Sequence, residues 1–147
     1  MKYTLYIDDG HDEEIIVYAR AKTPLIEGIE KLINAEKLNT HPIIGYVGDD
    51  IIEVDPSDVH CFFIEDKRLY ASMKDKRVLV KCRLYEIEER LPDSFIKINQ
   101  SSIANIRHIE RFSVSIGAAL CVHFKNGYRD YVSRRQLKAV KERLGIK

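Results

Sequence analysis

Short apolar segments follow one another at close intervals through the middle of this 147-residue chain, with turn residues between them. The turns include Gly48-Asp49-Asp50, Asp55-Pro56-Ser57 and Lys74-Asp75. Each segment has the length of a strand rather than that of a helix. A succession of short strands and tight turns is typical of antiparallel β-sheets. We therefore expect strands over residues 43–47, 51–54, 59–64, 68–73 and 76–82.

The C-terminal part continues this pattern with helical interruptions. Asn126-Gly127 is a strong hairpin signal, and Leu137, Val140 and Leu144 recur at helical spacing. Residues 103–106 are compatible with a short helix or with a strand. We expect helices over 84–91 and 134–144, an extended segment over 95–98, and strands over 110–115, 120–124 and 128–132.

The first 42 residues have a different pattern. Apolar residues alternate over 3–7, and Glu14–Ala19 is a short, mostly apolar run, which predicts two strands around the turn Asp8-Asp9-Gly10. Thr23-Pro24 is typical of a helix start, and apolar residues then recur at helical spacing. We therefore expect a ββα extension over residues 1–42, followed by a mainly β, antiparallel domain over residues 43–147.

The net charge of +1 hides an uneven distribution. Residues 1–66 carry 5 Lys or Arg against 15 Asp or Glu, whereas residues 67–147 carry 19 against 8. A strongly basic half predicts a polyanionic partner such as nucleic acid. Two alternatives remain open. The halves attract each other within one fold, or they meet between copies or on a protein partner, which would make the chain a protein-interaction module.

Three short polar segments of the chain could contact a ligand, and they are numbered by their order in the sequence. The third segment has the strongest signal and consists of Ser133, Arg134, Arg135 and Gln136. Ser133 and Gln136 have capping-box spacing, which places both arginines in the first turn of a helix. Cations are unfavourable at this end of the helix dipole unless an anion binds there. The free N–H groups of a helix N-terminus favour phosphate. We therefore expect the arginines to contact an anion, and the alternative is pairing with acidic residues of the same chain.

Two further segments carry weaker signals. The first segment, residues 65–68, is a turn whose Lys67 and Arg68 can reach phosphate or guanine. The second segment, residues 95–102, ends in polar residues. Among them Asn99 and Gln100 suit recognition of adenine in the major groove, and Ser101 suits a phosphate. Taken alone, a solvated hairpin tip and a plain polar turn explain both segments.

Together, the three segments resemble the LytTR DNA-binding domain family. The stretch from Phe95 to Ile109 is similar to that family's F-x-[RK]-x-[HN]-x-S-x-[IV]-x-N-x-x-x-I core. Phe124-Lys125-Asn126-Gly127, followed by Val132-Ser133-Arg134-Arg135, resembles its closing hairpin and its SRR signature. Residues 59–83 resemble its opening strands, so the resemblance covers about residues 43–147.

The resemblance implies an elongated antiparallel β-sandwich with few, short helices, which contacts successive major grooves of double-stranded DNA through loops. Some relatives have histidine in place of Lys67, and many have it in place of Ile98. The family binds tandem short repeats in pairs, so a homodimer on DNA is expected. The implied base contacts come from Lys67, Asn99, Gln100 and Arg135, and the implied backbone contacts from Arg68, Lys97, Ser101 and Arg134, with Ser133 beside them.

Many family members carry a receiver domain ahead of this module. Only about 42 residues precede it here, and a turn explains Asp8 and Asp9. A stand-alone regulator with a short extension is therefore expected. The acidic extension is expected to mediate dimerisation or to contact a protein partner.

Other classes of function fit poorly. The five histidines lack metal-ligand spacing, the three cysteines form no CxxC pair, and no glycine-rich phosphate loop occurs. We expect no enzyme activity, no metal and no cofactor. The sequence has neither an apolar run of ~20 residues, as a membrane span requires, nor a signal-peptide pattern, so we expect a cytoplasmic protein. RNA binding is a weaker alternative, because tyrosines such as Tyr70 and Tyr131 do not follow the pattern of RNA-binding sheets.

Overall fold

The structure is a computed structural model that describes residues 4, 10, 15–38 and 42–146. Within these residues the strands are β1 (Ile43–Val47), β2 (Asp50–Val54), β3 (Cys61–Glu65), β4 (Arg68–Ser72), β5 (Arg77–Val80), β6 (Phe95–Asn99), β7 (Ser102–Asn105), β8 (Ile109–Val114), β9 (Leu120–Phe124) and β10 (Arg129–Val132). They form a seven-stranded sheet in the order β2-β1-β5-β4-β3-β7-β6 and a three-stranded sheet in the order β10-β9-β8. Every pairing is antiparallel, which confirms the expected mainly β, antiparallel architecture.

The helices are α1 (Pro24–Leu38), α2 (Leu84–Glu88) and α3 (Arg134–Leu144), with short 3₁₀ turns at Pro56–Asp58 and Ile106–His108. The helix expected over 84–91 ends earlier because the chain tightens: the Arg90 N–H donates to the carbonyl of Ile87 at 2.9 Å. Of the residues left open at 103–106, the first three are in strand β7, which pairs with β3, and Ile106 begins the second 3₁₀ turn. The helix expected over 134–144 has the predicted bounds, with Ser133 as its N-cap.

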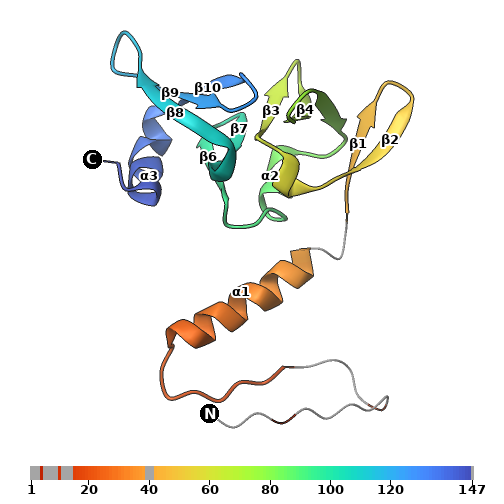
Figure 1. Cartoon of the computed structure of the whole chain (residues 1–147), viewed down its shortest axis with the longest axis vertical. Helices are drawn as coiled ribbons and strands as arrows, with labels where there is room; N and C mark the ends of the chain where they lie inside the picture. Colours follow the sequence, from red (N-terminus) through yellow and green to blue (C-terminus); the bar gives the residue numbers. More distant parts are fainter. Residues whose placement is uncertain (1–3, 5–9, 11–14, 39–41, 147) are drawn as a thin grey trace.

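The larger sheet packs on both of its faces. Phe62 and Ile103 are paired across β3 and β7 and belong to a core cluster that includes Leu84 and Ile87 of α2. The next pair along, Cys61 and Ala104, points to the other face. There it joins a second cluster with residues of the three-stranded sheet and of α3: Leu120, Val122, Phe124, Val132 and Val140. Figure 1 shows β8, β9 and β10 at the β6–β7 end of the sheet and β1–β2 at its far end.

The N-terminal extension departs from the expected ββα unit. The strand expected over 3–7 lies outside the described residues apart from Thr4, and residues 15–19 of the second expected strand are not in a strand. Ile15, Ile16 and Tyr18 are instead 68%, 60% and 93% exposed. Strand propensity acts only where a neighbouring strand completes the ladder. The expected helix is present as α1, which lies apart from the sheets in Figure 1.

None of the helices in the described part of the chain is long and apolar enough to cross a membrane.

Gly45 of β1 gives a test of the packing on the larger sheet. A Cβ atom at this position would lie 2.2 Å from Cγ1 of Val78 and 2.7 Å from Cγ2 of Val54, both buried side chains. We expect Gly45→Ala to lower the free energy of unfolding in urea by about 1–3 kcal/mol through overpacking. Gly28→Ala in α1 is the control, because a Cβ there meets no atom within 4 Å. Equal stability of Gly45→Ala and the parent would contradict the described packing.

Candidate nucleic-acid interface

The first and second segments lie next to each other at one end of the seven-stranded sheet. β3 pairs with β4, which it meets through the first segment, and with β7, which follows the second segment. The backbone N–H of Ile64 donates to the carbonyl of Ser101 at 2.8 Å and joins the two. Asp66 and Lys67 both have positive φ, 49° and 64°, as a tight two-residue hairpin turn requires. The exposed Lys67 and Arg68 therefore stand on a short, fixed tip.

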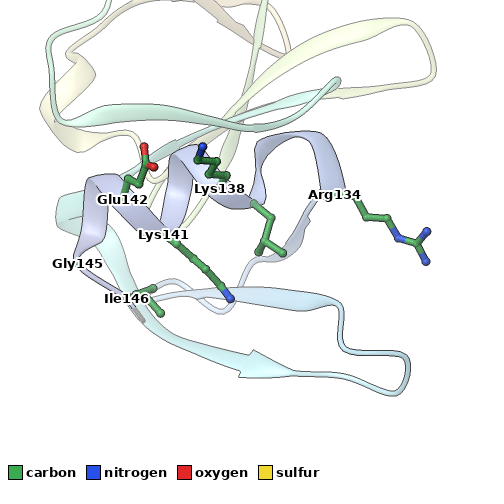
Figure 2. Close-up of a pocket in the computed structure, with 7 residues that line it drawn as sticks. Arg134, Lys138, Lys141, Glu142, Gly145 and Ile146 are labelled. Carbon is green, nitrogen blue, oxygen red and sulfur yellow. The ribbon is translucent and has the colours of Figure 1, made fainter.

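The third segment is attached directly to the second. The Ser133 N–H donates to the carbonyl of Ile98 at 2.9 Å, and its Oγ accepts from the Gln136 N–H at 3.3 Å to cap α3. Arg134 and Arg135 follow as exposed residues of the first turn. Figure 2 shows Arg134 extending away from α3. Among the described residues neither arginine has a carboxylate within ion-pair distance, so no ion pair in this part of the chain explains them.

Strand β10 and the turn before it cross the strand ends that carry the three segments. The Tyr128 ring stacks on Phe63 of β3, with centroids 4.8 Å apart. The Asp130 carboxylate accepts hydrogen bonds from Ser102 of β7 and from Asn99 of β6. The strand then leads into the third segment. β10 therefore passes β3, β7 and β6 in that order, and its residues hold the segments in fixed relative positions.

Asn99 is placed as a structural residue and does not fit the expected base contact. Its side chain is 3% exposed. The Nδ2 atom donates to Oδ1 of Asp130 at 3.0 Å and to the carbonyl of Tyr131 at 2.8 Å, and Oδ1 accepts from the Ser101 N–H at 2.8 Å. These bonds leave the amide no free donor for a base. The neighbouring Gln100 is exposed.

A β-bulge explains why the sequence did not distinguish these two amides. Alternation along a strand would bury Ile98 and expose Asn99. The pairing of β6 with β7 instead shifts register between Lys97 and Asn99, and Ile98 and Asn99 are both buried. The bulge thereby moves the exposed amide from Asn99 to Gln100.

Asp130 is a residue that the sequence analysis missed. Besides Asn99 and Ser102, it accepts a hydrogen bond from the hydroxyl of Tyr128 at 3.0 Å. Burial and the nearby carboxylate raise the pKa of Tyr128, so the phenol remains a donor. The available signal was weak: Asp130 is an acidic residue in a basic half of the chain, directly before the Tyr131-Val132-Ser133 approach to α3.

Lys97 is in the second segment but lies on β6, before the exposed turn of that segment. Its Nζ is 4.0 Å from Oε2 of Glu88 on α2, so its charge faces the opposite side of the larger sheet from the three-stranded sheet. Apart from Lys97 and the buried Asn99, the expected contact residues lie at the two turns and at the start of α3: Lys67, Arg68, Gln100, Ser101, Ser133, Arg134 and Arg135. No group of three or more His, Cys, Asp or Glu residues within the described ranges is arranged to hold a metal ion.

Several known proteins are similar to this chain in sequence or in fold. The LytTr DNA-binding domain family matches residues 49–145. A protein of Staphylococcus aureus (strain NCTC 8325) named as an HTH-type transcriptional regulator is 32% identical over 148 residues, which cover 99% of both chains. A protein of the same name from strain N315 is 32% identical over 147 residues, again 99% of both. The solved LytTr DNA-binding domain of a Bacillus cereus protein described as a methyl-accepting/DNA response regulator superposes with a TM-score of 0.66 at 28% identity, covering 71% of this chain and 98% of that one.

The relatives' label of helix-turn-helix type does not describe the helices seen here. α1 and α2 are separated by strands β1 to β5, and α2 and α3 by strands β6 to β10. A helix-turn-helix requires two helices joined by a short turn. In the described part of the chain, the expected contact residues lie on two turns and in the first turn of α3.

The adjacent amides Asn99 and Gln100 give a matched test of this geometry. Asn99→Ala would leave the Ser101 N–H and the acceptors on Asp130 and Tyr131 without their partner, so we expect the free energy of unfolding in urea to fall by about 1–3 kcal/mol. Gln100→Ala removes an exposed side chain and should change it by less than about 0.5 kcal/mol. Equal stability of the two variants would argue against a buried role for Asn99.

Proposed function

Because the chain belongs to the LytTR DNA-binding domain family, we propose that this DNA-binding regulator recognises specific sequences in double-stranded DNA through loops placed in successive major grooves. One observation carries the proposal: two turns and the start of α3, each with exposed hydrogen-bonding or cationic side chains, are joined side by side by backbone hydrogen bonds, Ile64 to Ser101 and Ser133 to Ile98. Tips that are fixed before binding lose little conformational entropy when they meet a groove.

We assign base contacts to the exposed tips Lys67, Gln100 and Arg135. Lys and Arg match the acceptors of guanine, and Gln matches the donor–acceptor pair of adenine. Phosphate contacts fall to Arg68, Ser101 and Arg134, the last beside the free N–H groups of α3 and its cap Ser133. Asn99 makes no DNA contact in this proposal and instead holds the backbone of the second segment in place. Lys97 is not assigned a DNA contact.

We further propose that two copies bind a pair of tandem short repeats. The three segments of one chain are expected to contact one short repeat. A second chain on the next repeat would add its own phosphate and base contacts, which raises both affinity and sequence preference. The extension is proposed to bind a second copy of this chain or a protein partner, since Leu25 and Leu32 of α1 are 53% and 73% exposed. Paired apolar side chains at helical spacing favour contact with another surface.

The role of Arg135 is tested with a duplex enriched from a random library by the parent protein. We expect Arg135→Ala to weaken binding to that duplex by about 1–3 kcal/mol and to relax selection at one base position, because a bidentate guanine contact is lost. Fluorescence anisotropy at two salt concentrations, against a scrambled duplex, measures both effects.

Lys97→Ala is the comparison, since it removes a cation that faces α2, and it should leave both affinities near those of the parent. Failure of the parent to enrich any sequence, or normal selection by Arg135→Ala, would overturn the proposal.

Binding in pairs has its own measurement. On a duplex with two copies of the enriched repeat, sedimentation should give two protein chains per duplex, and on a duplex with one copy a single chain at lower affinity. A single chain on the two-repeat duplex at saturation would contradict pairwise binding.

A further inference from the structure

A row of three basic side chains crosses the three-stranded sheet. Arg111 of β8 and Arg129 of β10 each pair in register with His123 of β9. Residues that are opposite one another on neighbouring strands share a face, and with strands about 4.8 Å apart the two arginines are on the order of 10 Å apart. Both are exposed. His123 between them is 8% exposed, and its Nε2 is hydrogen-bonded to Oγ of Ser113 at 2.7 Å.

Two arginines share this face, and Glu110 is the carboxylate whose charge acts on His123 between them. The next row along it consists of the uncharged Ser113, Cys121 and Tyr131. Within the described residues neither Arg111 nor Arg129 forms an ion pair. Burial and the two arginines lower the pKa of His123, against a weaker opposing effect of Glu110, so the imidazole is neutral near pH 7. Two exposed arginines without an ion-pair partner among the described residues make this face attractive to an anion.

The row lies beside the three contact segments. Tyr128 stacks on Phe63 next to the first segment, and Asp130 binds Asn99 of the second. Arg129 stands between them in β10, and strand alternation turns its side chain to the side opposite Asp130, away from the core. β10 ends at Val132, and Ser133 caps α3 directly after it, so Arg129 lies on the strand that links the first segment to the third. A duplex that contacts both of these segments therefore passes β10.

We propose that Arg111 and Arg129 bind phosphates of the DNA strand that runs alongside β10 between the first and third segments. The proposal rests on the DNA-binding function above and extends its surface from the turn segments to the outer face of the three-stranded sheet. Guanidinium groups match phosphate oxygens with two parallel hydrogen bonds. Because phosphate contacts carry no direct base information, the row adds affinity for any duplex and leaves sequence preference unchanged.

The test uses the full chain with Arg111→Gln, with Arg129→Gln and with both. Affinity for the enriched and scrambled duplexes is measured by anisotropy between about 50 and 200 mM salt. We expect the slope of log K against log[salt] to become shallower by about 0.9 for each arginine removed and by about 1.8 for the double variant, on both duplexes. Arg20→Gln removes the same charge from the exposed extension and should keep the parental slope.

Two further comparisons separate the possible results. Equal urea midpoints of variants and parent show that a loss does not reflect unfolding, and Arg129→Lys should retain most of the slope because it keeps the charge. A parental slope in the double variant, or a loss confined to the enriched duplex, would overturn the phosphate assignment. If Arg135→Ala still loses selection in that case, the proposed function stands without the row; if it does not, both fall.

Discussion

The Asp130 carboxylate joins the two sheets and fixes their relative position. It lies on β10 and receives hydrogen bonds from Asn99 at the end of β6, Ser102 at the start of β7 and Tyr128 in the preceding turn. A partly buried carboxylate is tolerated because these donors replace its water. Its position fixes where β10 crosses the larger sheet, and the start of α3 follows from that. The three segments therefore owe their relative positions to this polar contact together with the backbone hydrogen bonds that join them.

Much of the architecture follows from patterns within short stretches of sequence. Turn residues at close intervals predicted the antiparallel strands, and the Ser133 cap with the apolar spacing after it predicted α3 with its observed bounds. What failed depends on partners distant in sequence. The β-bulge that buries Asn99 and the Glu88 partner of Lys97 come from β7 and α2, and residues 15–19 had the propensity of a strand without a described neighbour to pair with. Local sequence patterns could not predict these contacts between residues that are distant in sequence.

Side chains of the same chemical type have different roles in this fold, depending on whether their hydrogen-bonding groups are already paired. Asn99 and Gln100 are neighbouring amides, yet one is saturated by Asp130, Tyr131 and Ser101 while the other is open to solvent. A hydrogen-bonding side chain that is already saturated holds neighbouring backbone in place, and an open one selects a ligand. The arginines divide in a similar way: Arg77 is stacked on Tyr70 with its centre 4.3 Å from the ring and is paired with Glu65, while Arg134 and Arg135 have no ion-pair partner among the described residues.

The short length of β10 has a consequence for how proteins of this architecture can diversify. Tyr131 and Asp130 point to opposite faces, so inserting one residue would exchange the outward and inward sets and break the contact with Asn99. Insertions and deletions within β10 are therefore tolerable only in pairs of residues, and each pair changes the strand length by about 6.6 Å. Proteins of this architecture would then keep the length of β10 or change it in discrete steps of two residues.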